Sequence, residues 1–98
     1  MSVRFSDGAA ARFDAIDAWW RENRDKAPGL FDKEVAAAIA TLDAAPNAGA
    51  FYKRVRGREV RRLLLKKTRH YLYYRLDDDG DVEVITIWGA QRRFGPRL

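Results

Sequence analysis

The segment from residue 58 to residue 93 restricts the fold of this chain more than any other part of the sequence. It contains three runs of apolar, aromatic and β-branched residues, separated by Thr68-Arg69 and by an acidic stretch at residues 77–81. Runs of this composition, bounded by polar turn residues, are typical of consecutive β-strands. The segment therefore predicts three adjacent strands, which need a covering layer on one face.

The acidic stretch contains Asp79-Gly80, and an Asp-Gly pair between apolar runs favours a tight hairpin. With these two residues as the loop, four pairs face each other: Tyr74 with Ile85, Leu72 with Ile87, Tyr73 with Thr86, and Tyr71 with Trp88. Successive side chains of a strand point to opposite faces. This register therefore predicts a core face with Leu72, Tyr74, Ile85 and Ile87, and an outer face with Tyr71, Tyr73, Arg75, Thr86 and Trp88.

The predicted outer face carries three large rings and an arginine, which is more exposed aromatic surface than a domain without a partner usually presents. One interpretation is that these side chains bind a partner. The other is that a loop or the glycine- and proline-rich tail, residues 89–98, covers them.

The first half of the chain predicts the covering layer. Residues 3–5 alternate as in a short edge strand, and Ser6 or Asp7 can cap a helix whose apolar face contains Ala9, Phe13, Ile16 and Trp20. A second helix is predicted over residues 28–44, with an apolar stripe of Phe31, Val35, Ala38 or Ile39, and Leu42. Two helices joined by a short break usually pair antiparallel.

Between the helices and the hairpin, residues 48–58 are predicted to form a connector and residues 60–67 a strand. The predicted fold is a single α+β domain over residues 1–98. It has an N-terminal edge strand and a helical hairpin packed on a twisted, mainly antiparallel sheet of three to four strands.

Charge is distributed unevenly along the chain. Residues 1–52 carry 6 Lys/Arg against 8 Asp/Glu, whereas residues 53–98 carry 13 against 6. A basic sheet half attracts nucleic acid or an acidic protein segment, although a solvated basic face is the alternative. The sequence has no cysteine and no apolar run of signal-peptide or membrane-span length, so we expect a cytoplasmic protein without a membrane partner.

Several kinds of chemistry are not supported by the sequence. One histidine and no cysteine make a zinc site improbable, and the acidic stretch lacks the glycine and the terminal glutamate of a calcium loop, so we expect neither a metal nor a cofactor. His70, the single imidazole, could act as a general base toward an RNA 2′-hydroxyl, with arginines stabilising the developing charge. A structural role for this histidine is the alternative.

The helical hairpin, the segment RRLLLKKTRHYLYYRL, the Asp-Gly turn and the closing VEVITIWGAQR together resemble the RelE/ParE superfamily of toxins from bacterial type II toxin-antitoxin modules. The resemblance covers nearly the whole chain. It implies a toxin that arrests growth, as in plasmid-stabilisation modules, and a cognate acidic antitoxin that wraps around it; a toxin-antitoxin hetero-oligomer is left open.

Two activities occur in that superfamily. RelE-like toxins cleave mRNA on the ribosome without a metal, and the resemblance would assign that role here to Arg61, Arg62, His70, Arg92 and Arg93. ParE-like toxins poison DNA gyrase. The chain departs from the RelE pattern at Leu64, Tyr71 and Gln91 and has no tyrosine after Tyr74.

These departures favour the ParE-like branch, in which the protein would not be an enzyme. A non-toxic basic domain that binds nucleic acid is the third hypothesis. The side chains predicted to contact the target or the antitoxin are Tyr71, Tyr73, Arg75, Trp88, Arg92, Arg93, Lys66 and Lys67.

Overall fold

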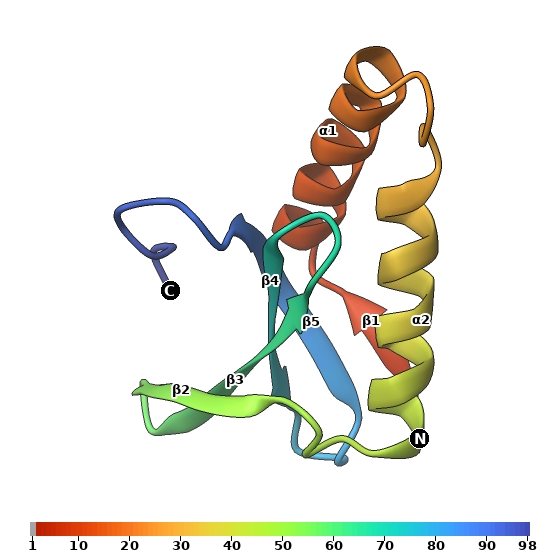
Figure 1. The fold of residues 1–98 in the computed structure, drawn as a ribbon. Helices are drawn as coiled ribbons and strands as arrows, with labels where there is room; N and C mark the ends of the chain where they lie inside the picture. The colour runs from red at the N-terminus through yellow and green to blue at the C-terminus, as the bar shows by residue number, and fades with distance from the viewer. Residues whose placement is uncertain (1) are drawn as a thin grey trace.

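One mixed sheet of five strands forms the centre of the fold, and two helices cover one of its faces (Figure 1). The computed structural model describes residues 2–98. The elements, in chain order, are β1 (Val3–Phe5), α1 (Asp7–Asn23), α2 (Leu30–Ala44), β2 (Ala50–Val55), β3 (Arg58–Leu65), β4 (His70–Leu76) and β5 (Val82–Gly89). Their order across the sheet is β1-β5-β4-β3-β2, in which β1 and β5 run parallel and the other neighbours antiparallel. The predicted α+β class is confirmed.

The sheet has one strand more than the upper limit of the prediction. The additional strand is β2, which lies in the segment predicted as a connector, and it pairs with β3 alone. No residue of β2 is buried on either face, so the strand lacks the alternation of apolar and polar residues that marks a half-buried strand. The turn from β2 to β3 contains Arg56 and Gly57, both with positive φ, as a tight two-residue hairpin requires.

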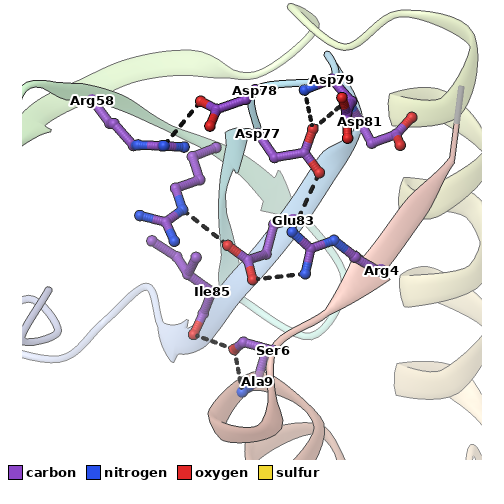
Figure 2. Close-up of polar contacts among 11 residues, drawn as sticks. Arg4, Ser6, Ala9, Arg58, Asp77, Asp78, Asp79, Asp81, Glu83 and Ile85 are labelled. Carbon is purple, nitrogen blue, oxygen red and sulfur yellow. Dashed lines mark hydrogen bonds and ion pairs between the residues drawn. The ribbon is translucent and has the colours of Figure 1, made fainter.

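The two helices form the predicted antiparallel pair on one side of the sheet (Figure 1). Ser6 is the N-cap of α1, and its side chain accepts a hydrogen bond from the Ala9 amide at 3.1 Å (Figure 2). Both predicted apolar faces point to the core, with Ala9, Phe31, Val35 and Leu42 among its buried members. Within residues 2–98, no helix combines the length and hydropathy needed to cross a bilayer.

The β4–β5 hairpin follows the predicted register at one end and departs from it at the other. Tyr71 pairs with Trp88, Leu72 with Ile87 and Tyr73 with Thr86, as predicted. Tyr74, however, pairs with Val84, so Ile85 is an extra residue that forms a β-bulge. The bulge moves Ile85 out of the core, and Val82 and Val84 are buried there instead. The prediction that Ile85 belongs to the core face is therefore wrong.

The cause of the shift is the length of the acidic turn. The loop between Leu76 and Val82 has five residues, and the Asp77 carboxylate accepts hydrogen bonds from the amides of Asp79 and Asp81 at 2.9 and 3.0 Å. Arg4 contacts the same carboxylate and also Glu83 (Figure 2). These contacts hold an odd-length turn, and the bulge then restores the alternation of the strands.

Tyr74 joins the core to the chain that leads into β2. Its ring is fully buried, its hydroxyl donates to the Pro46 carbonyl at 2.8 Å, and the same oxygen accepts from the Gly49 amide at 2.9 Å. Burial raises the pKa of the Tyr74 phenol. The neutral phenol is thus the form that the folded state stabilises.

Tyr74→Phe should lower the free energy of unfolding at neutral pH by about 1–3 kcal/mol, because two buried polar groups lose their partner. An unfolded tyrosine ionises near pH 10 while the folded Tyr74 phenol stays protonated, so wild type should lose more stability than the variant as pH rises past about 10. The difference between the two proteins in urea denaturation should therefore shrink from pH 8 to pH 11. A difference that grows with pH would contradict this assignment.

Candidate functional site

Four aromatic rings and one guanidinium lie on the sheet face away from the helices, and the tyrosine rings meet edge to face or tilted. We call this set, made of Tyr52, Arg62, Tyr71, Tyr73 and Trp88, the ring face. The Arg62 guanidinium carbon lies 4.0 Å from the centre of the Tyr71 ring and 4.9 Å from that of Tyr52. Arg62 has no carboxylate partner among residues 2–98, so cation–π contacts position it. The charge stays available to an anionic partner.

The ring face is less open than the sequence predicted. Tyr73 is only 2% exposed, because Tyr52 and Tyr71 pack against it and the C-terminal tail runs across this side of the sheet (Figure 1). Pro96 is buried, and the Trp88 indole donates a hydrogen bond to the Phe94 carbonyl at 2.7 Å. The interpretation that the tail covers part of this face is confirmed. Tyr73, predicted as a contact residue, is instead buried beneath the other rings.

Trp88 lies between two arginines. The guanidinium carbons of Arg92 and Arg12 are 4.4 and 5.1 Å from its ring centre. Arg12 reaches this position because β1 pairs with β5 only as far as Val84, which leaves the rest of that strand edge open. The Arg12 side chain donates to the Ile87 carbonyl at this edge, at 3.1 Å. Burial and the neighbouring Arg92 lower the pKa of Arg12.

His70 lies on the helix side of the sheet, opposite the ring face. Its ring contacts Phe31 edge to face at 5.4 Å, and its Nδ1 is buried without a hydrogen-bond partner among the described residues. Burial is the main cause that lowers the pKa of His70, and with the charges of Arg12 and Arg92 it outweighs the opposing effects of the Thr68 backbone and Glu34. The imidazole is therefore neutral at neutral pH and could accept a proton.

The five residues considered for RNA cleavage are divided between the two faces of the sheet. Arg61 points to the helix side, where it donates to the Gly49 carbonyl at 2.6 Å and contacts Glu59, while its neighbour Arg62 belongs to the ring face. Arg92 lines the same cleft as His70, and Arg93 lies 5.5 Å from the ring of Phe94. The structure thus brings His70 and Arg92 together but separates them from Arg61 and Arg62.

The remaining predicted contact residues differ in their availability. Arg75 forms an ion pair with Glu83 at 2.9 Å. Lys66 and Lys67 are exposed at the β3–β4 turn, and this turn is fixed by Glu34, which accepts hydrogen bonds from the amides of Lys67 and Thr68. The two lysines, but not Arg75, can therefore offer unpaired charge to a partner.

A cleft of about 450 Å³ opens between the C-terminal half of α1, the β3–β4 turn and the end of β5. Its lining contains four arginines, two indoles and the single imidazole: Arg12, Arg24, Arg69, Arg92, Trp19, Trp20 and His70, together with Ala15, Ile16, Thr68, Gly89 and Gln91. No pattern in the sequence predicted this cleft. Helical spacing offered one signal, since Arg12 follows Ala9 by three residues and precedes Ile16 by four, which places it beside the apolar stripe.

No group of three or more potential metal ligands occurs among residues 2–98. The acidic turn is explained by its internal contacts, since the Asp77 carboxylate is already occupied by two backbone amides and Arg4. The arrangement can therefore bind anions through guanidinium groups and rings through stacking.

Comparison with known proteins identifies the family of this chain. A family model described as "ParE toxin of type II toxin-antitoxin system, parDE" matches residues 3–94. The chain belongs to this ParE toxin family. The membership covers both helices and all five strands, and it confirms the resemblance drawn from the sequence, including the favoured branch. A search of curated proteins returned no match.

Solved toxin structures share the fold of this ParE-family chain. The chromosomal ParDE toxin-antitoxin system from P. aeruginosa superposes with a TM-score of 0.73 at 23% identity, covering 93% of this chain and 97% of that one. The isolated E. coli RelE toxin gives 0.58 at 17% identity, covering 93% and 85%. The intact E. coli RelBE complex gives 0.56 at 18%, covering 93% and 98%. Both branches of the superfamily are thus built on this fold.

Proposed function

We propose that this ParE-family protein is a cytoplasmic toxin that arrests growth by poisoning DNA gyrase when it is free of its antitoxin. One observation carries the choice of target. The five residues that RNA cleavage would need do not form one site, because His70 lies on the opposite face of the sheet from Arg62 and Arg61 is bound to the Gly49 carbonyl. A general base must lie within hydrogen-bond reach of the proton that it removes.

The ring face offers what protein recognition requires. Interface residues that contribute most to binding are often Tyr, Trp and Arg, and this face presents Tyr71 beside Arg62 and Trp88 beside Arg92. We propose that the target contacts these side chains together with Lys66, Lys67, Arg92 and Arg93. Their positive charge would steer an acidic surface toward the toxin.

We also propose a cognate antitoxin. The ParDE and RelBE structures that share the fold are toxin-antitoxin systems, and the basic half of this chain suits an acidic segment that folds on binding. Such a segment would cover the ring face and neutralise its charge.

Purified wild-type protein should inhibit supercoiling by gyrase. Tyr71→Ala should weaken this inhibition by about tenfold or more, since a ring at the centre of an interface typically contributes on the order of 2 kcal/mol. Phe51→Ala is the matched control, because Phe51 is an exposed ring that pairs with Arg61 on the opposite face of the sheet. Unchanged supercoiling at an excess of wild-type protein would argue against gyrase as the target.

The RNA-cleaving alternative predicts a different result. If the protein acts on the ribosome, transcripts mapped by primer extension after induction should carry cuts in phase with codons, and His70→Ala should abolish them. Intact transcripts together with inhibited supercoiling would support gyrase as the target and contradict mRNA cleavage.

A further inference from the structure

The cleft at the end of α1 holds positive charge that no acidic side chain neutralises. None of its four arginines forms an ion pair with a carboxylate within residues 2–98. Glu34 is the acidic residue whose charge acts on His70. Its two carboxylate oxygens already accept three hydrogen bonds from Lys67 and Thr68. An anion entering the cleft would therefore meet guanidinium groups without competing carboxylates.

The positions of these arginines are fixed by the fold. Arg12 is held at the β5 edge by its bond to the Ile87 carbonyl, and Arg92 by its contact with Trp88. Arg69 occupies the left-handed region at a φ of 63°, and its carbonyl accepts a hydrogen bond from the Ala90 amide at 2.8 Å. Elements far apart in the chain thus bring Arg12, Arg69 and Arg92 to the lining of one cleft.

Two further features narrow the class of ligand. Guanidinium groups match the oxygens of a phosphate in paired hydrogen bonds. Trp19, which is 47% exposed, adds an indole surface at the rim, where a nucleobase can stack. A volume of about 450 Å³ lies within the usual range for small-molecule sites.

We propose that this cleft binds a phosphate group of a nucleotide, with Arg12, Arg69 and Arg92 around the phosphate and the base against Trp19. The ligand is either a free nucleotide or a nucleotide within a single strand. The cleft shares Arg92 with the proposed gyrase-binding surface, but binding of a nucleotide there requires no other protein and can be tested without gyrase.

The test is titration of the purified protein, without gyrase, by ATP, tripolyphosphate, a short single-stranded DNA and a glutamate-rich peptide. Arg69→Asn should weaken ATP binding by about tenfold, because a charge-assisted hydrogen bond is lost. Asparagine tolerates the left-handed region, so the variant should retain its thermal stability. Trp19→Leu should weaken binding of ATP but not of tripolyphosphate.

Arg56→Asn is the matched control. Arg56 also has a positive φ, of 51°, and carries the same charge, but it lies in the β2–β3 turn, at the other end of β3 from Arg69. Its replacement should leave ATP affinity unchanged. Equal losses in the two variants, no binding of any phosphate probe, or tighter binding of the glutamate-rich peptide would each overturn the proposal. Preference for ATP or for DNA would identify the source of the phosphate.

Discussion

Replacing Gly49 with alanine should lower the free energy of unfolding by about 3 kcal/mol or more. The added methyl group would overpack this part of the core and would break buried hydrogen bonds. A Cβ at this position would lie 2.7 Å from the Arg62 carbonyl oxygen and 2.7 Å from Cε1 of the Tyr74 ring. Neither neighbour can yield easily, since one is backbone of β3 and the other is fully buried. Urea denaturation at neutral pH measures the change.

Gly29→Ala is the control for this variant. Gly29 precedes α2 at a φ of −97°, and a Cβ there would meet no atom within 4 Å. Gly29 is the N-cap of α2, where alanine is less favourable than glycine, so its replacement should cost no more than about 1 kcal/mol. If Gly49→Ala proved as mild as Gly29→Ala, the close packing of the chain before β2 against Tyr74 would be incorrect.

The second large effect is expected at Glu34, where alanine should cost about 3 kcal/mol. The Glu34 carboxylate accepts from the amide of Lys67 at 2.7 Å, from the amide of Thr68 at 3.0 Å and from the Thr68 hydroxyl at 2.6 Å. Thr68 is 5% exposed, so water cannot fully replace the lost acceptor. Hydrogen exchange at the two amides, together with urea denaturation, tests this contact between α2 and the β3–β4 turn.

Asp43→Ala provides the comparison on the same helix. Asp43 is exposed near the C-terminal end of α2, where a negative charge opposes the helix dipole, so alanine there should be neutral or slightly stabilising. Equal effects at both positions would show that lost charge, and not lost hydrogen bonds, explains the result at Glu34. Glu34→Ala should also disturb the cleft at the end of α1, because Thr68 and Arg69 belong to the lining of that cleft.

Much of the fold could be predicted because its signals are local. The spacing of Ala9, Phe13, Ile16 and Trp20 identified the buried face of α1, and the pairs from Tyr71 to Tyr73 followed from the position of the Asp-Gly turn. The bulge at Ile85 could not be predicted from alternation. Whether the acidic turn has two or five residues depends on contacts of Asp77 with its own loop and with Arg4, which is distant in sequence.

The candidate site was predictable only in part. Strand alternation placed Tyr71 and Trp88 on the face away from the helices, and their contacts with Arg62 and Arg92 are consistent with that placement. The burial of Tyr73 and the pairing of Arg75 with Glu83 depend on neighbouring strands and on the tail. Arg12 and Arg69 gave no strong signal, because each becomes part of a site only where separate elements meet.

The sequence by itself determined the α+β class, both helix faces and the ParE/RelE resemblance, since periodicity and turn residues act over short stretches of chain. Only the tertiary structure decided which charges remain unpaired. It paired Arg61 with Glu59 and left Arg62 without a carboxylate partner among residues 2–98, seated the tail on the ring face and gathered arginines from α1, the β3–β4 turn and the tail around one cleft. The physical reason is that hydrogen bonds and ion pairs join residues that are far apart in the chain, and local sequence patterns do not predict which of these residues will meet.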